Sequence, residues 1–338
     1  MSEPVSTVCA MTGGGDGLSG GQPHDALFRS VFGDPEHAGS ELRSVVPPEL
    51  IGHLDLDRLV RQDGTFIDDA LRHRHTDVLF ATTVRGRDAY LYVLLEHQST
   101  PDPLMAFRMA GYQHRIWERH LDMYPPEAGH RPLPLIIPIV IYQGRRRWTA
   151  PTDLAGLLDV DPELSVAAGD LIPRVFYLLD DLTVIDEHEM RARPLSTAAR
   201  LTFVSFENAP GDRDATRWMG EWADDLAALD QRWLVPIFTY ILRVSVTPVD
   251  RLVDFATTLG PDVKEAAMTT AEQLIAEGES RGAARGEARV LINMLTLKFG
   301  ELDDDTKNLV RGATADQIDL WSARFVAGAA DIDAVFDR

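Results

Sequence analysis

Residues 76–80 read Thr-Asp-Val-Leu-Phe, and residues 90–99 read Tyr-Leu-Tyr-Val-Leu-Leu-Glu-His-Gln-Ser. Both segments are short, apolar and rich in β-branched or aromatic residues, a composition typical of buried strands. The sequence Arg-Gly-Arg-Asp at residues 85–88 lies between them and is typical of a tight turn. The pattern therefore predicts a β-hairpin, and each of its strands carries one acidic residue.

The turn sets which residues face each other across this hairpin. Gly86 and Arg87 fit a two-residue type II′ loop, and that loop places Asp77 directly opposite Glu96. Opposed residues hold their Cβ atoms about 4.5–5.5 Å apart, and Gln98, two residues further on, points to the same face. Close carboxylates repel unless a cation or a shared proton lies between them, so a divalent metal is the simplest occupant.

Asp77 and Glu96, each taken alone, also fit purely structural roles. Asp77 alone is explained by a cap at the start of a strand, and Glu96 alone by an ion pair with Arg108 or Arg85. A slip of one residue in the register would send the two acids to opposite faces of the sheet.

Composition indicates an ordinary globular protein of two or three domains: 338 residues, 45% hydrophobic and 25% charged. The longest apolar run, residues 133–142, is far shorter than the roughly 20 residues of a membrane helix, so we expect no membrane partner. The N-terminus has no signal-peptide pattern, and we expect a cytoplasmic protein. Cys9 is the only cysteine, which excludes an intrachain disulfide and a thiolate metal cluster.

The net charge of −20 argues against a protein that coats nucleic acid, although it leaves room for a local basic groove. Nearly all the cations are arginines, and several cluster near the two acids, including Arg145 to Arg147. Arginine suits phosphate contacts, and a solvated surface is the alternative interpretation of such clusters.

Helical spacing of apolar residues predicts helices over 25–32, 35–46 and 104–121. Residues 133–142 and 175–179 are predicted strands, so the order is helix, helix, strand, strand, helix, strand, loop, strand. This order predicts an α/β fold in which helices flank a mixed sheet.

The organisation along the chain follows from the same patterns. Residues 1–22 have no apolar periodicity and are interpreted as a flexible tail before an α/β core over 23–190. A helical subdomain is predicted over 191–262 and a C-terminal helical segment over 263–338. In the last segment Gly278, Gly282 and Gly286 fit either a weak helix or the seam of a homo-oligomer.

The chain resembles the recombination-promoting nuclease, or putative transposase (YhgA-like), family of the PD-(D/E)XK nuclease superfamily. The matching pieces occur in the family order over roughly half of the chain. They are Pro23 to Phe28, Thr76 to Phe80, Leu95 to Ser99, Arg108 with Gly111-Tyr112, and Ile141 to Gly144 before Trp148.

This resemblance implies a restriction-endonuclease-like core that cleaves DNA with a divalent metal. Asp77 and Glu96 then become the metal-binding carboxylates, and Gln98 replaces the lysine of many superfamily members, a variant that is usual in this family. Mg²⁺ is the expected cofactor, with Mn²⁺ as an alternative, because it prefers oxygen ligands. Glu41 is a further candidate, as a helical acid seen in some members.

Two hypotheses follow from the residues and the resemblance together. The first is a Mg²⁺-dependent DNA endonuclease, with Arg108 and Tyr112 as weaker candidates for contacts around the site. The second is a DNA- or protein-binding regulatory module with little or no catalytic activity on the same fold. A nuclease acting on RNA or on a nucleotide is a third class that no residue excludes.

Overall fold

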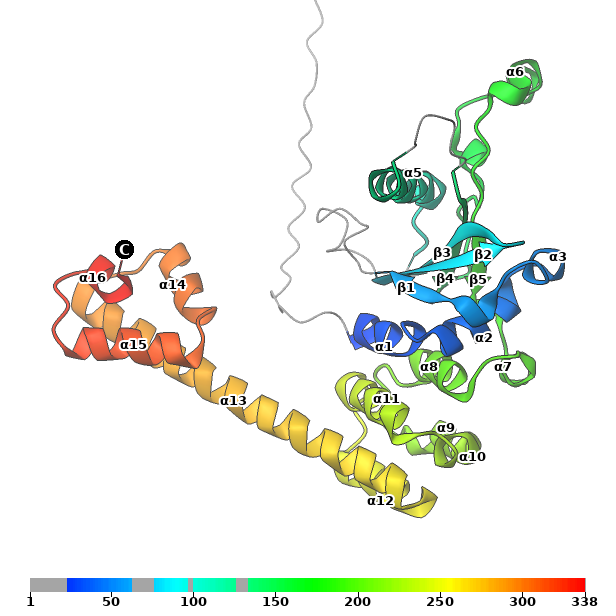
Figure 1. Ribbon diagram of the computed structural model, residues 1–338. Helices are drawn as coiled ribbons and strands as arrows, with labels where there is room; N and C mark the ends of the chain where they lie inside the picture. Colours follow the sequence, from blue (N-terminus) through cyan, green and yellow to red (C-terminus); the bar gives the residue numbers. More distant parts are fainter. Residues whose placement is uncertain (1–22, 63–75, 97–99, 126–132, 338) are drawn as a thin grey trace, which may run out of the picture. The chain divides into compact units, whose positions relative to one another are not determined.

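The computed structural model describes residues 23–62, 76–96, 100–125 and 133–337 (Figure 1). The chain divides between Pro248 and Val249 into two compact units, each of which is described by itself.

The first unit contains the sheet and most of the helices. Its N-terminal half consists of α1 (Pro23–Phe32), α2 (Pro35–Val45), α3 (Pro48–Ile51), η1 (Leu56–Arg58), β1 (Val60–Gln62), β2 (Thr76–Val84), β3 (Arg87–Glu96), α5 (Met105–Met123) and β4 (Leu135–Tyr142). Its remainder consists of η3 (Leu154–Leu157), α6 (Pro162–Ala168), η4 (Gly169–Leu171), β5 (Leu178–Asp181), η5 (Leu182–Val184), α7 (Glu187–Ala192), α8 (Thr197–Asn208), α9 (Thr216–Glu221), α10 (Ala223–Ala227) and α11 (Gln231–Val244).

The sheet has the strand order β1-β2-β3-β4-β5. The first three strands are antiparallel, and β4 and β5 run parallel to β3, so the sheet is mixed. Helix α5 covers one face, while α1, α2 and α8 lie on the other (Figure 1). The expected α/β fold with a mixed sheet and flanking helices is therefore confirmed.

The hairpin turn differs from the expected one. Val84 pairs with Arg87, so the two loop residues are Arg85 and Gly86 rather than Gly86 and Arg87. Both have positive φ, 49° and 74°, as a type I′ turn requires. This turn twists in the same sense as the strands, which explains why a non-glycine residue is tolerated in the left-handed region.

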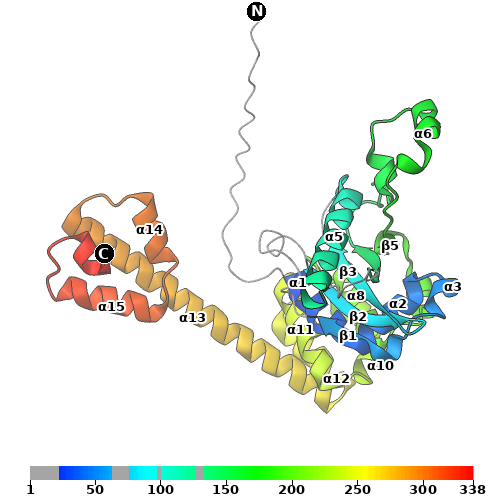
Figure 2. The same ribbon diagram turned by 45° about the horizontal axis from the view of Figure 1, so that its top comes forward.

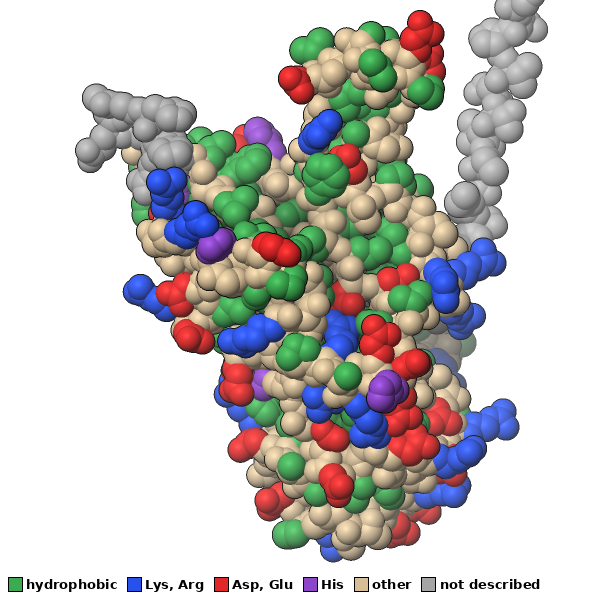
Figure 3. All heavy atoms as spheres, turned by 90° about the vertical axis from the view of Figure 1, so that its right-hand side faces the viewer, with side chains coloured by type: hydrophobic (Ala, Val, Ile, Leu, Met, Phe, Trp, Pro, Cys, Tyr) green, Lys and Arg blue, Asp and Glu red, His purple; other side chains and the backbone are tan. Residues whose placement is uncertain are grey.

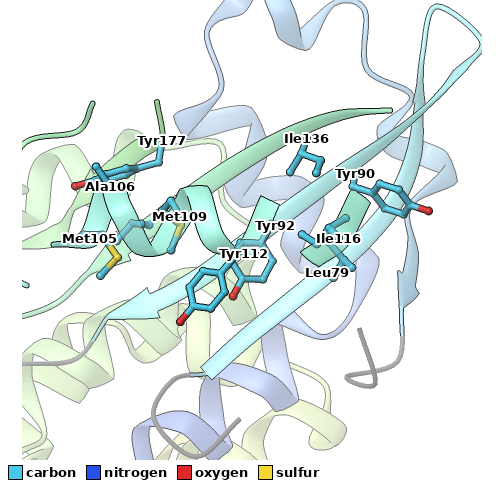
Figure 4. Close-up of a cluster of buried hydrophobic side chains, with 11 residues drawn as sticks. Leu79, Tyr90, Tyr92, Met105, Ala106, Met109, Tyr112, Ile116, Ile136 and Tyr177 are labelled. Carbon is cyan, nitrogen blue, oxygen red and sulfur yellow. The ribbon is translucent and has the colours of Figure 1, made fainter. Parts of the chain in front are cut away.

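The face under α5 holds a hydrophobic cluster that joins helix and sheet (Figure 4). Tyr90 and Tyr92 of β3 contribute from the sheet, and Met105, Met109 and Tyr112 contribute from α5. The steps of four and three residues along α5 place these side chains on one helical face, as the sequence pattern predicts.

The opposite face is packed by aromatic side chains of the other helix layer. The ring of Phe32 in α1 stacks on Phe28 at 4.8 Å and on Phe203 of α8 at 4.9 Å. All three side chains are almost completely buried. Helices α8 and α11 thus pack on α1 and α2, and α1 and α2 in turn contact β2 and β5 of the sheet.

Three details of the strands were not expected. The short edge strand β1 is additional, and β5 begins at Leu178, a few residues later than the predicted segment. Pro138 lies in the interior of β4 and keeps its register opposite Tyr92, although proline removes one donor from the ladder.

The connection between β4 and β5 carries α6 on a projecting arm (Figure 2). Hydrophobic and acidic side chains gather on its surface at the top of the view in Figure 3. Val166 and Leu171 are the most exposed of its large apolar residues, at 83% and 87%.

The second unit consists of α12 (Val249–Leu259), α13 (Pro261–Phe299), α14 (Asp304–Arg311), α15 (Ala315–Val326) and α16 (Ile332–Phe336). The last three helices pack around the C-terminal part of α13 through a cluster that includes Leu295, Trp321 and Phe336. Between Glu272 and Glu287 no described side chain is buried. The helical C-terminal region is therefore confirmed.

No helix in the described part of the chain combines the length and the hydropathy that a membrane span needs.

Candidate active site

Asp77 is the second residue of β2, and Glu96 is the last residue of β3. β4 ends at Tyr142 opposite Glu96, and β5 ends at Asp181 opposite Tyr142. We call this end of the sheet the carboxylate end, and the end with the β2–β3 loop the turn end.

The prediction that Asp77 lies directly opposite Glu96 is wrong. Asp77 pairs with Leu94, because the loop is one residue closer to the N-terminus than expected. Glu96 is two positions beyond Leu94, and side chains alternate with a period of two, so Asp77 and position 96 share one face. Such diagonal neighbours lie about 7–8 Å apart, a spacing that weakens their direct repulsion.

The side chain of Glu96 and the whole of Gln98 lie outside the described residues. Among the described residues there is no group of three or more His, Cys, Asp or Glu side chains that could hold a metal ion. The roles given to Glu96 and Gln98 thus stay predictions.

Asp77 is half-buried and is held by a tyrosine that the sequence analysis did not single out. The hydroxyl of Tyr92 donates a hydrogen bond to Asp77 Oδ2 at 2.9 Å. Tyr92 is fully buried, and burial together with the Asp77 carboxylate raises its pKa well above the usual value. The phenol therefore stays protonated and remains a donor at neutral pH.

A sequence signal for Tyr92 does exist. Tyr92 lies two positions before Leu94, the partner of Asp77, so Tyr92 belongs to the face that carries Asp77. A buried tyrosine usually needs a partner for its hydroxyl, and Asp77 is the acidic residue diagonally across the hairpin.

The two weaker candidates on α5 lie on the same face as Asp77. The Tyr112 ring is 5.3 Å from the Tyr92 ring, and the Tyr112 hydroxyl accepts a hydrogen bond from Arg108 Nη2 at 3.2 Å. Figure 4 shows the two tyrosines as neighbours. Arg108 also forms an ion pair of 2.5 Å with Asp102, whose side chain is 21% exposed. Arg108 is therefore part of a chain of contacts that supports Tyr92 and, through it, Asp77.

Glu41 lies on the other side of the sheet. Its carboxylate, almost fully buried, is 3.2 Å from Arg193 Nη2, and the same nitrogen is 2.7 Å from Asp180 Oδ2. Asp180 pairs with Ile141, which alternates with the residues facing α5. The structure therefore does not bring Glu41 together with Asp77.

The Glu41 cluster holds two carboxylates and one guanidinium in a dry environment. Burial, followed by the Asp180 carboxylate, raises the pKa of Glu41 well above its usual range. This residue joins α2 to β5 and to the segment before α8, a structural role that the sequence pattern did not reveal.

Comparison with known proteins matches residues 22–232 to a family described as putative transposase, YhgA-like. Recombination-promoting nuclease RpnA of Escherichia coli K12 is 31% identical over 265 residues, which are 77% of this chain and 86% of RpnA. Recombination-promoting nuclease RpnD of E. coli O157:H7 is 37% identical over 169 residues, 50% of this chain and 62% of RpnD.

A further relative, the inactive recombination-promoting nuclease-like protein RpnE of E. coli K12, is 29% identical over 82% of this chain and 90% of its own length. No solved structure matches. The family match covers more than half of the chain, including both strands of the hairpin and α5, so the chain belongs to the YhgA-like family of putative transposases.

Proposed function

We propose that this protein is a metal-dependent endonuclease that hydrolyses phosphodiester bonds of DNA in the cytoplasm. The observation that supports the proposal is the strand register, in which Asp77 pairs with Leu94, two positions before Glu96, at the carboxylate end. Relatives named recombination-promoting nucleases support a nuclease activity. On this proposal the sheet and its helices are a restriction-endonuclease-like core of the PD-(D/E)XK type.

The donor chemistry at the carboxylate end fits a hard divalent cation. Asp77 supplies carboxylate oxygens, Glu96 would supply two more, and Mg²⁺ or Mn²⁺ prefers such oxygen ligands over nitrogen or sulfur. Asp77 and Glu96 would therefore hold the ion. Polarisation of the scissile phosphate and a lowered pKa of a nearby water are the chemistry that the ion supplies when bound.

The residues of the chain position the reacting groups. The Tyr92 hydroxyl fixes the Asp77 carboxylate in one orientation, as partners of metal-binding carboxylates commonly do. Gln98 would orient the attacking water or a phosphate oxygen, because an amide does not accept a proton at neutral pH. Tyr112 and Arg108 would act through Tyr92 rather than on the substrate.

One observation favours the second candidate function, a binding or regulatory module without catalysis. RpnE aligns with 82% of this chain and is named inactive. The presence of Asp77, Glu96 and Gln98 in this sequence favours the nuclease, since a protein that only binds has no need of this set.

Cleavage of supercoiled plasmid DNA tests the proposal. Wild-type protein should nick the plasmid with Mg²⁺ and not with EDTA, and both Asp77→Asn and Glu96→Gln should abolish nicking. Asp88→Asn is the matched control, because Asp88 lies on the same hairpin at the turn end. If wild-type protein cleaves nothing with Mg²⁺ or Mn²⁺ at low salt, the binding module becomes the better account.

A further inference from the structure

Three consecutive arginines, Arg145, Arg146 and Arg147, follow β4 after Gln143 and Gly144 at the carboxylate end. This is the one run of three adjacent cations in the whole sequence. β4 ends at Tyr142 beside Glu96, and neighbouring strands lie about 4.8 Å apart, so β2 with Asp77 is about 10 Å from β4. The arginines therefore lie beside the proposed active site, within the span of a few nucleotides.

The loop that carries these arginines is anchored at both ends. Gln143 Nε2 donates a hydrogen bond to the backbone oxygen of Phe206 in α8. On the other side the Trp148 amide donates to Asp181 Oδ2 at 2.8 Å, and the Trp148 ring packs edge-on against Tyr142 at 4.8 Å. Four residues between fixed points have little freedom, so the three side chains project from a preorganised loop.

All three arginine side chains are exposed, and no hydrogen bond or ion pair joins them to another described residue. Arg108 and Arg193, by contrast, are tied to carboxylates. Like charges held side by side repel, and an anionic partner removes that repulsion. The guanidinium fork matches phosphate oxygens in pairs of hydrogen bonds.

We propose that the Arg145–Arg147 loop binds the phosphate backbone of the DNA strand that enters the active site. The inference rests on the proposed function and deepens it, because it names the basic element that a protein of net charge −20 needs for DNA. The loop contributes affinity without sequence preference, since phosphates carry no base information.

Binding of a fluorescent DNA duplex, measured by anisotropy over a series of salt concentrations in EDTA, tests the proposal without cleavage. The variant replaces all three arginines of the loop by glutamine. The control replaces Arg58, Arg85 and Arg87, which are also exposed and lie at or near the turn end. Both variants lose three charges, so a general charge effect would appear in both.

Each lost phosphate contact reduces the slope of log affinity against log salt by about 0.9. The loop variant should therefore have a slope shallower by about 2–3, and the control should keep the wild-type slope. Between 50 and 200 mM salt the wild type would lose about 40-fold more affinity than the loop variant. Equal slopes in both variants, no DNA binding by wild type, or binding of an RNA duplex alone would overturn the inference.

The plasmid assay separates this inference from the proposed function. If the wild type cleaves DNA and the loop variant binds and cleaves as well as the control, the nuclease stands and the loop assignment fails. If DNA binding depends on the loop but Asp77 and Mg²⁺ have no effect on the plasmid, the loop assignment stands and the nuclease fails.

Discussion

Replacement of Tyr92 by phenylalanine should weaken metal binding without changing the fold. The substitution removes only the hydroxyl that donates to Asp77 at 2.9 Å. The ring stays in place, fully buried and 5.3 Å from Tyr112, so the packing under α5 is retained. The expected defect is therefore a carboxylate that is less firmly oriented.

Two independent energies give the expected loss of Mg²⁺ affinity. A hydrogen bond to a charged acceptor contributes about 1.5–3 kcal/mol. Loss of a residue that orients a metal ligand typically reduces metal affinity by about 10–100-fold, which corresponds to about 1.4–2.8 kcal/mol. The agreement between these ranges predicts a rise of one to two orders of magnitude in the Mg²⁺ concentration for half-maximal cleavage.

The assay is the initial rate of plasmid nicking as a function of Mg²⁺ concentration, with Mn²⁺ binding followed by water-proton relaxation as a readout independent of activity. Tyr90→Phe is the matched control. Tyr90 lies two residues away on the same strand and face, and its hydroxyl is 3.0 Å from His120 Nδ1 at the turn end. Both variants lose a buried hydrogen bond, but only one of them loses a contact with Asp77.

Two outcomes would refute the reasoning. An unchanged Mg²⁺ requirement in Tyr92→Phe would show that the hydroxyl does not orient a metal ligand. An equal rise in both variants would show that the effect comes from general destabilisation of the sheet. Restoration of the full rate by excess Mg²⁺ in Tyr92→Phe alone is the result that supports the proposed role.

Three further predictions concern stability. Arg193→Leu should lower the free energy of unfolding in urea by about 3–5 kcal/mol, because it leaves buried carboxylates unpaired. Arg43→Leu removes an exposed ion pair and should lower the same free energy by less than about 1 kcal/mol. Equal losses in the two variants would contradict the role assigned to Arg193. Burial raises the pKa of Glu41, so the protonated form favours folding, and the free energy of unfolding should fall as pH rises above the ordinary glutamate range towards the raised pKa. Urea titrations at several pH values should show that Glu41→Gln loses this part of the pH dependence. An unchanged dependence of the unfolding free energy on pH in Glu41→Gln would contradict the assignment to Glu41. Alanine at Gly278, Gly282 and Gly286 of α13 should increase the protection of nearby amides in hydrogen exchange by about 0.5–1 kcal/mol each, because an added Cβ meets nothing within 4 Å. Reduced protection would instead favour a contact between two copies of the chain at these glycines.

The sequence alone predicts the hairpin strands, β4 and α5 well, because their apolar patterns are long and regular. Residues 104–121 correspond to α5 within two residues, and the predicted strand at 133–142 corresponds to β4. The helix α5 buries one continuous stripe and the strand β4 buries both of its faces, so the hydrophobic pattern alone identifies each of them. The edge strand β1 has only three residues, two of them exposed, and gives no comparable signal.

The contacts that support the site are much harder to predict. Arg193 meets Glu41 across 152 residues of sequence, and no local pattern connects two such distant positions. The pairing depends on where α8 packs against α2, which follows from the tertiary fold rather than from propensity. The contact between Tyr92 and Asp77 is easier to predict, because both residues belong to the same hairpin and the register of that hairpin decides whether they are neighbours.

The error in that register changes the partner of Asp77 but not the face to which Asp77 belongs. Any two-residue hairpin loop pairs residues whose numbers sum to an odd value, so moving the loop by one residue shifts each partner by two positions. Side chains alternate with a period of two, and a shift of two therefore returns every residue to the same face. Asp77 moves from Glu96 to Leu94 as its opposed partner, yet position 96 keeps its side of the sheet. The face of Asp77 thus depends on the apolar pattern that the core enforces, while its opposed partner depends on the turn alone.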